Sequence, residues 1–273
     1  MVENIYTNYA YQMSELSHQY GANVRLSANP FLLTQLAQLS GPGTIQPQIT
    51  LLVKQLYRSL TEIVLANEFP TTPAEVPTRM AESTARGVWR GEVLSPQTPA
   101  VTAGIARAGT LPSQIVFEAL TEILDPAGVR QDHIYMARVT NDDGVVTGVS
   151  VAGSKIGGGI KDAILILPDP MGATGGSMSK AISMYKEIGE TYGAPSKIIT
   201  INLIITPEYI KRLVTDHPDV VIYGLRLDRG LSCAEVLRSA PGELWEREIG
   251  LNELQYIVPG AGGVGEIMNN SFV

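Results

Sequence analysis

The chain has 273 residues, of which 44% are hydrophobic and 17% are charged, and its net charge at pH 7 is −7. This balance excludes a disordered chain, and the negative charge argues against non-specific binding to nucleic acid. Cys233 is the only cysteine, so an intrachain disulfide cannot form and a reducing compartment is expected. The sequence has no signal-peptide pattern and no apolar run near the ~20 residues of a membrane span. We therefore expect a cytoplasmic protein that binds neither nucleic acid nor membrane.

Residues 1–28 are polar and rich in tyrosine, which predicts an arm or short helix that packs on a partner subunit. A partly ordered terminus is the alternative. Residues 29–273 are expected to form a single domain that starts with helices. Asn29 is a suitable N-cap and Pro30 suits a first turn. Apolar residues at helical spacing then predict one helix up to residue 39 and another over residues 48–69.

A connection rich in Pro, Thr and Arg follows over residues 70–91, and residues 84–93 fit either a strand or a loop. Residues 100–106 predict a short apolar strand, and residues 111–124 have helical spacing. Arg107, Ala108 and Gly109 lie between them, at the carboxyl end of the strand. Ligands of open α/β sheets bind at such ends. The turn is therefore a candidate binding site, with a surface ion pair of Arg107 as the alternative.

The segment that follows the predicted strand at residues 133–139 is rich in Gly, Val and Asp and lacks a helical period. This composition predicts a β-hairpin or a mobile flap over about residues 138–159, and long loops of this kind often act as lids. Lys155 could reach a phosphate from the flap. A solvated surface charge is the alternative interpretation of Lys155.

Residues 163–185 predict a buried strand, a loop of small residues and the start of a helix. Such a loop presents backbone N–H groups at a helix N-terminus, where the helix dipole favours an anion. Asp169, at the carboxyl end of the strand, is placed to accept hydrogen bonds from sugar hydroxyls. A loop that binds a phosphate at the helix N-terminus and a diol at Asp169 is suited to a ribose phosphate. An ordinary glycine-rich βα turn is the alternative, and no Lys follows the glycines as in a Walker A loop.

Residues 197–206 form the most strand-like run in the chain, a helix is predicted after Thr206 and Pro207, and residues 219–223 predict another strand. Alternation of strands and helices from residue 163 to residue 223 indicates right-handed βαβ units and a parallel sheet. The expected fold class is therefore α/β, with a mostly parallel twisted sheet flanked by helices. His217 precedes Pro218 at a helix end, where a structural role is favoured over acid–base chemistry.

Three strings of the chain resemble motifs of the uracil phosphoribosyltransferases. The first resembles DPMLATGGS, the motif of that family for 5-phosphoribosyl 1-pyrophosphate (PRPP). The matching residues are Asp169, Pro170, Met171, Ala173, Thr174, Gly175, Gly176 and Ser177, and Gly172 takes the place of Leu. The turn at residues 107–109 resembles the family's RAGL turn, and residues 256–266 resemble its string YIIPGLGDAGD. Residues 205–208 also resemble the start of an ITPEG-like segment of the family.

The resemblance implies a type I phosphoribosyltransferase core with an N-terminal helical segment, a β-hairpin flap and a C-terminal hood over residues 251–267. Residues 232–250 then form an insertion before the hood. The implied reaction is transfer of the phosphoribosyl group from PRPP to uracil, giving UMP and pyrophosphate in pyrimidine salvage. A homodimer or higher homo-oligomer is expected. Mg²⁺ would bind mainly through PRPP, as hard cations with few protein ligands do, with no metal site built by the protein.

Residue roles also follow from the resemblance. Asp169, Arg107 and Arg138 would be the catalytic residues. PRPP would be bound by Arg107, Ala108, Gly109, Arg138, Asp169, Pro170, Met171, Ala173, Thr174, Gly175, Gly176 and Ser177. The base would be framed by Tyr256, Ile257, Gly262, Gly263 and Val264, largely through their main-chain groups.

The chain departs from the family pattern mainly in the hood. Gly263 and Ile267 replace Asp and Arg, and Glu266 replaces Asp. In the flap, Ala137 replaces the Tyr of a Tyr–Arg pair. Two alternatives therefore stay open beside uracil transfer: a phosphoribosyltransferase for a different nucleobase, and a regulatory homologue that binds PRPP or a nucleotide without catalysis.

Overall fold

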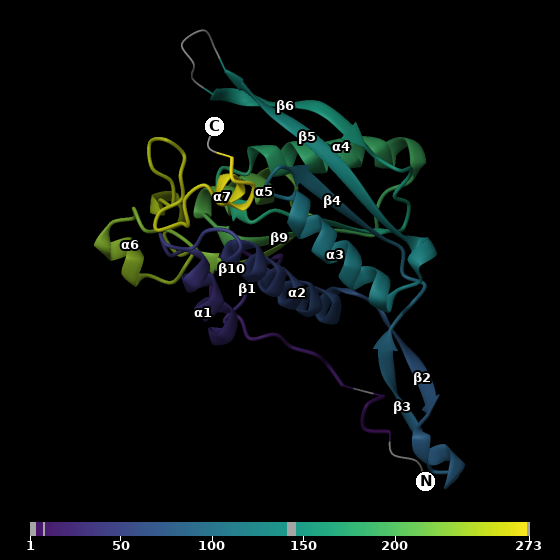
Figure 1. Cartoon of the computed structure of the whole chain (residues 1–273). Coiled ribbons are helices and arrows are strands. Elements are labelled where there is room, and N and C mark those ends of the chain that lie inside the picture. The colour runs from purple at the N-terminus through teal and green to yellow at the C-terminus, as the bar shows by residue number, and fades with distance from the viewer. Residues whose placement is uncertain (1–3, 8, 141–145, 272–273) are drawn as a thin grey trace.

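The computed structural model describes residues 4–7, 9–140 and 146–271 (Figure 1). Its main sheet has eight strands, with seven in the order β1-β10-β9-β7-β4-β5-β6 and β8 beside β9. Neighbouring strands are parallel, apart from the antiparallel pair β5 and β6. The expectation of an α/β fold with a mostly parallel sheet is therefore confirmed.

The strands of the main sheet are β1 (Val24–Leu26), β4 (Ala100–Ala106), β5 (Val129–Thr140), β6 (Val146–Lys155), β7 (Ile164–Pro168), β8 (Met171–Gly172), β9 (Lys197–Ile205) and β10 (Val221–Leu227). The α-helices are α1 (Pro30–Leu39), α2 (Gln48–Glu68), α3 (Thr110–Ile123), α4 (Gly176–Tyr192), α5 (Pro207–Asp216), α6 (Ala234–Arg238) and α7 (Val264–Met268). Short 3₁₀ turns are at Arg79–Glu82, Pro126–Gly128 and Trp245–Arg247.

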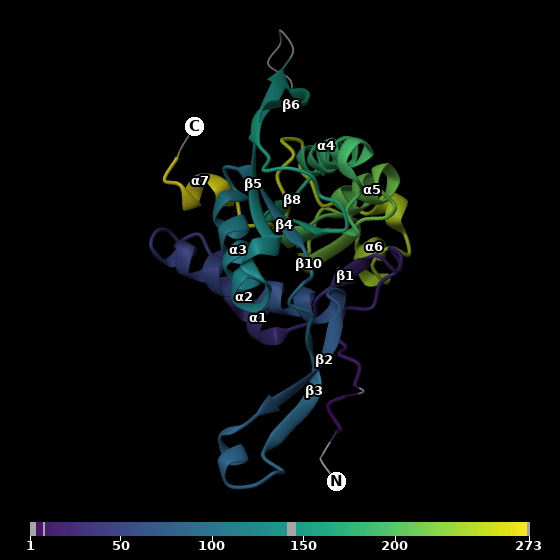
Figure 2. The ribbon, with the colours of Figure 1, turned by 90° about the vertical axis from the view of Figure 1, so that its right-hand side faces the viewer.

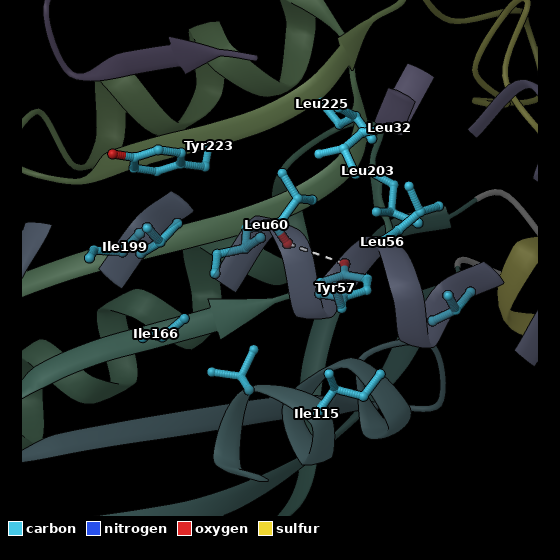
Figure 3. Packing of buried hydrophobic residues seen from close by; sticks show 14 of the residues in the cluster. Leu32, Leu56, Tyr57, Leu60, Ile115, Ile166, Ile199, Leu203, Tyr223 and Leu225 are labelled. Atoms are coloured by element: carbon cyan, nitrogen blue, oxygen red, sulfur yellow. Dashed lines mark hydrogen bonds between the residues drawn. The ribbon is translucent and has the colours of Figure 1, made fainter. Parts of the chain in front are cut away.

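Helices cover both faces of the sheet, as Figure 2 shows edge-on. The side chains of a strand alternate between the two faces, so β7 contributes to two cores. Ile164 and Ile166 pack in the core under α1, α2 and α3, which is drawn in Figure 3. Leu165 and Leu167 pack in the core under α4 and α5. The continuous apolar run of β7 is thus explained by burial on both faces.

The local signals at helix starts act as the sequence predicts. The Asn29 side chain accepts hydrogen bonds from the N–H groups of Phe31 and Leu32 at the start of α1. The Thr206 side chain accepts from the N–H group of Tyr209 at the start of α5. These caps satisfy backbone donors that have no partner within the helix.

Two segments that gave weak signals in the sequence form strands. β1 lies within the predicted N-terminal arm and pairs in parallel with β10 at the edge of the main sheet. In the Pro-rich connection, β2 (Thr71–Pro77) pairs antiparallel with β3 (Val88–Leu94). This hairpin extends from the end of the molecule opposite the β5–β6 flap (Figures 1 and 2). Each of these strands forms by pairing with residues of another segment, and local composition does not reveal that pairing.

The segment predicted to be an insertion, residues 232–250, packs on the N-terminal segment through a buried network. Glu248 accepts hydrogen bonds from Arg229, at 2.7 Å, and from the Tyr20 hydroxyl, at 2.5 Å. Tyr20 also lies edge-on to Trp245, whose indole N–H donates to the carbonyl of Pro207. The insertion is therefore fixed to the protein at several points and begins close to the hood.

Candidate active site

The two predicted phosphate-binding segments lie side by side at the carboxyl ends of paired parallel strands. The turn of residues 107–109 follows β4, and the loop of residues 169–175 follows β7; we call these two segments the phosphate half of the site. Gly109 shows how closely they approach, because a Cβ there would lie 2.9 Å from the carbonyl oxygen of Pro168. The structure therefore brings together residues that are about sixty positions apart in the sequence.

Arg107 presents an exposed guanidinium group at the turn. Its Nη1 donates a hydrogen bond to the hydroxyl of Ser271, in the last described segment of the chain. Ser271 in turn donates its N–H to the carbonyl of Glu266 in α7. The C-terminal segment thus reaches the cation predicted to contact pyrophosphate, which the sequence did not indicate.

Asp169 is held by its main chain at the end of β7. Its N–H donates to the carbonyl of Ile201 at 3.0 Å, and its carbonyl accepts from the Asn202 side chain at 2.7 Å. Its Oδ1 accepts from the N–H of Met171 at 3.0 Å. Burial raises the pKa of the Asp169 carboxyl to about 6, and the hydrogen bond from Met171 opposes that increase. The carboxylate therefore keeps one oxygen for a ligand.

The rest of the loop leads into α4 with its backbone fixed. The Thr206 hydroxyl donates to the carbonyl of Ala173 at 2.7 Å, and the carbonyl of Pro170 accepts from two N–H groups of β9. Gly175 has φ = 77°, in the left-handed region that favours glycine. The N-cap residue Gly175 has no side chain, and the one capping contact in the described residues is a 3.4 Å hydrogen bond from the N–H of Gly176 to the Thr174 hydroxyl. The first N–H groups of this 17-residue helix can therefore receive an anion, beside the Thr174 and Ser177 hydroxyls.

A charged anchor holds the middle of the hood. Arg226 and Asp228 form a two-point ion pair, with both N···O distances at 2.7 Å. Asp228 also accepts the N–H of Gly260 at 2.8 Å, and Arg226 donates to the carbonyl of Gly260 at 2.9 Å. Asp228 is buried. The sequence analysis did not single out this pair, although its i, i+2 spacing at a strand end is a usable signal.

The predicted base-binding residues differ in which of their groups are buried, exposed or already hydrogen-bonded. The side chains of Ile257 and Val264 are buried in the hydrophobic core. Tyr256 is exposed, and its N–H and carbonyl already bond Asn252. Gly262 has open space around it, since a Cβ there would meet nothing within 4 Å. A Cβ on Gly263, in contrast, would overlap the Glu266 carboxylate.

Helix α7 connects the hood to the phosphate half. A Cβ on Gly265 would lie 3.1 Å from the Cβ of Ala108, so this side of α7 lies against the turn that carries Arg107. Ile267 lies on the opposite side of the helix, given a rotation of about 100° per residue. There it lines a cavity of about 600 Å³ with Gly262 and the α1–α2 connection. The hood therefore contacts the anion site on one side and borders an open cavity on the other.

No contact among the described residues places the predicted cations Arg138 and Lys155 at this site. The side chain of Arg138 lies outside the described residues, although its backbone pairs with Val149 in the flap. Lys155 is exposed and pairs with His133 at the level of Gly104, before the end of β4.

His217 is buried and its Nε2 lies 3.0 Å from the carbonyl of Ser179, as expected of a structural residue.

Comparison with known proteins connects this geometry to one family. A family profile described as uracil phosphoribosyltransferase matches residues 26–247. The chain is 39% identical over 112 residues to a uracil phosphoribosyltransferase of Caldanaerobacter subterraneus subsp. tengcongensis, which is 41% of each protein. It is 36% identical over 107 residues to that of Chlamydia muridarum, which is 39% of this chain and 27% of the relative. These alignments therefore span less than half the length of the relatives.

The fold is similar to that of the AQ2163 protein from Aquifex aeolicus. The TM-score is 0.66 at 19% sequence identity, and the superposition covers 90% of this chain and 97% of the other. At this identity the likeness concerns the fold alone. Within the described residues, no helix is long and apolar enough to cross a membrane.

Proposed function

The chain belongs to the uracil phosphoribosyltransferase family, and on this premise we propose that it transfers the 5-phosphoribosyl group of PRPP to uracil, giving UMP and pyrophosphate. One observation carries the proposal. The turn with Arg107 and the loop from Asp169 to the start of α4 lie against each other at the carboxyl ends of β4 and β7. A cation, a carboxylate and a helix N-terminus then face one ligand that contains pyrophosphate, a diol and a phosphate.

In this reaction the bond from the anomeric carbon to pyrophosphate breaks, and a bond to a ring nitrogen of the base forms. The nitrogen loses its proton, and the ribose passes through a state with oxocarbenium character. Arg107 would stabilise the charge that develops on pyrophosphate, and Asp169 would hold the ribose hydroxyls. Ala173, Thr174, Gly175, Gly176 and Ser177 would bind the 5′-phosphate at the start of α4. The contribution of the protein is mainly positioning and charge stabilisation.

Arg138 and Mg²⁺ would complete the pyrophosphate site. Across the described ranges, no group of three or more His, Cys, Asp or Glu side chains is arranged to hold a metal. We expect the ion to bind mainly through PRPP oxygens and water, with few protein ligands. Mg²⁺ would neutralise charge on the pyrophosphate, and Arg138 would approach it from the flap.

Base selection would depend on the main chain of the hood. A pyrimidine edge alternates donors and acceptors, and the N–H groups of Gly262 and Gly263 can donate to its acceptors, while their carbonyls already accept from Val264 and Ile267. The buried side chains of Ile257 and Val264 support this, because only their main chain is available. The absence of the family's Asp at Gly263 and of its Arg at Ile267 motivates the second candidate, a different nucleobase as acceptor.

We further propose that the protein works in pyrimidine salvage in the cytoplasm as a homodimer or larger homo-oligomer. The expectation of an oligomer rests on the family resemblance and the N-terminal helices, and sedimentation of the purified protein tests it. The free thiol of Cys233 is in keeping with a reducing compartment.

The test is pyrophosphate release with saturating PRPP, Mg²⁺ and uracil, repeated with a panel of other bases. Release that depends on uracil supports the proposal. Release only with another base replaces the acceptor and keeps the reaction. PRPP that raises the unfolding temperature while no base turns over would identify a regulatory binding protein and refute the enzyme.

A further inference from the structure

A buried hydrogen-bonded chain lies directly beneath the loop that carries Asp169. The hydroxyl of Tyr209, on α5, donates to Oδ1 of Asn202 at 3.0 Å. Nδ2 of Asn202, on β9, donates to the carbonyl of Asp169 at 2.7 Å. Tyr209 is 1% exposed and Asn202 is fully buried, so water cannot replace either bond without reorganisation of the core. The main chain of Asp169 is thus linked through Asn202 to the side chain of Tyr209 on α5.

The ring of Tyr209 also determines where the loop can run. A Cβ on Gly172 would lie 3.0 Å from Cγ and Cδ2 of Tyr209 and 2.9 Å from Cγ2 of Ile205. The loop therefore rests on the ring with no room for a larger residue at position 172. The family motifs that the chain resembles have Leu at the position of Gly172 and Gly at the position of Tyr209. This chain therefore has the small residue in the loop and the large residue on α5, which is the reverse of the family motifs.

The start of α5 fixes the following residues of the same loop. The N–H of Thr206 donates to the carbonyl of Gly172 at 3.1 Å, and its hydroxyl donates to the carbonyl of Ala173. A Cβ on Gly175 would lie 3.1 Å from the Cβ of Arg212, one turn further along α5. One face of α5 therefore touches the loop from Gly172 to Gly175, and Tyr209 is the residue that links this face to Asp169.

We propose that Tyr209 is a positioning residue of the PRPP site, which sets the place of Asp169 through Asn202 and the path of the loop through its ring. The inference deepens the proposed function and rests on it. A carboxylate that holds a diol must be placed to within about 0.5 Å, which requires supporting groups whose own conformations are locked. The Thr206 cap, the ring contact and the two buried bonds provide such support from the end of β9 and the start of α5.

A purely structural role is the competing explanation, because buried tyrosine hydroxyls normally find a partner. Tyr223 provides the comparison within this chain. Its side chain is 1% exposed and its hydroxyl donates to Glu68 at 2.6 Å, away from the loop. If burial and a satisfied hydroxyl were all that mattered, removal of either hydroxyl would affect stability and leave ligand affinity unchanged.

The first experiment compares Tyr209→Phe with Tyr223→Phe. Affinity for PRPP with Mg²⁺ is measured by calorimetry without any base, beside the thermal unfolding midpoint. Tyr209→Phe is expected to weaken PRPP binding about five- to tenfold, the range for loss of one buried hydrogen bond. Tyr223→Phe is expected to change the unfolding midpoint alone. Equal PRPP affinities for wild type and Tyr209→Phe would overturn the role of the hydroxyl.

The second experiment exchanges the packed pair. Gly172→Leu alone should displace the loop and reduce PRPP affinity at least about a hundredfold, as a misplacement near 1 Å does. The double variant Gly172→Leu with Tyr209→Gly removes the overlap and should recover most of this loss. Failure of the double variant to recover any affinity, while it remains folded by circular dichroism, would overturn the role of the ring.

These measurements are separable from the proposed activity. Wild-type protein that binds PRPP and turns over no base would refute the transferase, and the variants would still report on Tyr209. Wild-type protein that turns over uracil with no response to either Tyr209 change would refute only the positioning role.

Discussion

The phosphate half and the hood are built by different means. In the phosphate half, backbone contacts leave little freedom, and a Cβ on Gly109 would meet three backbone atoms of Ile105 and Pro168 at 2.9 Å. In the hood, Gly262 has open space around it, and Gly263 is crowded only by the movable end of Glu266. The hood is held at Gly260 by Arg226 and Asp228, and on either side of Gly260 by the buried side chains of Ile257 and Val264.

This difference follows the chemistry that each region would perform. Phosphate, pyrophosphate and ribose are the same for every acceptor, so their loop can be packed to one geometry. A base edge differs from one acceptor to another, and the open space at Gly262 allows the hood to change residues there without loss of the fold. The departures from the family pattern at positions 263, 266 and 267 lie in the less constrained region.

The largest expected effect is at Arg107. Arg107→Ala should lower kcat/KM for PRPP. The loss of transition-state stabilisation should be about 2–4 kcal/mol, the range for a charge-assisted contact to a transition state. Steady-state kinetics with varied PRPP measures it. Arg90→Ala is the control, since Arg90 pairs with Glu75 on the distant β2–β3 hairpin and surface pairs contribute little. An unchanged kcat/KM for the Arg107 variant would refute its assignment.

Asp228→Asn tests whether the hood can be loosened independently of the phosphate half. It removes the charge that pairs with Arg226, so the free energy of unfolding should fall by about 2–3 kcal/mol. The KM for the base should rise about tenfold or more, the equivalent of ~1.4 kcal/mol, because the hood loses its anchor at Gly260. The equilibrium Kd for PRPP should stay unchanged. A matching increase in that Kd would show that the two regions are not independent.

Gly109→Ala and Gly263→Ala form a matched pair across the two regions. The first places a methyl group against backbone atoms that cannot move alone, which should cost about 1–3 kcal/mol of stability. The second needs only a rotation of the Glu266 side chain and should cost less than about 1 kcal/mol. Chemical denaturation of both variants measures the contrast. Similar losses would contradict the view that the hood is less constrained.

The smallest effect concerns the charge of Asp169. Burial raises the pKa of this carboxyl in the folded protein to about 6, above its value in the unfolded chain. Ionisation therefore destabilises the fold, increasingly as the pH rises from about 4 to about 6. The free energy of unfolding of Asp169→Asn should therefore increase relative to that of wild type as the pH rises. This difference between variant and wild type should be larger at pH 8 than at pH 5 by on the order of 1 kcal/mol. Thermal unfolding at the two pH values tests this.

The same charge should control activity in the opposite direction. Because the ionised carboxylate accepts hydrogen bonds from the ribose hydroxyls, wild-type kcat/KM for PRPP should fall as the pH decreases through about 6. Asp169→Asn should be folded and poorly active at pH 8. A flat pH profile for wild type between pH 5 and pH 7 would argue against the ribose role of Asp169.

Much of the fold was predictable because its signals are local. The apolar runs of β4, β7, β9 and β10 and the caps at Asn29 and Thr206 are encoded within a few residues of where they act. The turn of residues 107–109 and the loop after β7 were predictable for the same reason. Parallel strands also place their carboxyl ends at one edge, so their proximity follows from the topology.

The supporting residues were not predictable in this way. Nothing near Asn202 or Tyr209 in the sequence indicates Asp169, and the anchor between Asp228 and Gly260 spans 32 residues. The strand β1 and the hairpin β2–β3 likewise exist through pairing partners far along the chain or in a Pro-rich stretch. Local propensity is a weak guide where burial and pairing decide the outcome.

By itself, the sequence determined the order of helices α1 to α5 and of strands β4, β7, β9 and β10, the glycine-rich loop between β7 and α4, and the family to which these residues point. Only the tertiary structure decided that α5 supports this loop, that Asp169 is buried enough to hold its proton up to a pH of about 6, and that the hood is anchored at Gly260. The physical reason is that motifs are set by short-range backbone requirements. Support and pKa depend on side chains that meet only after the sheet has formed.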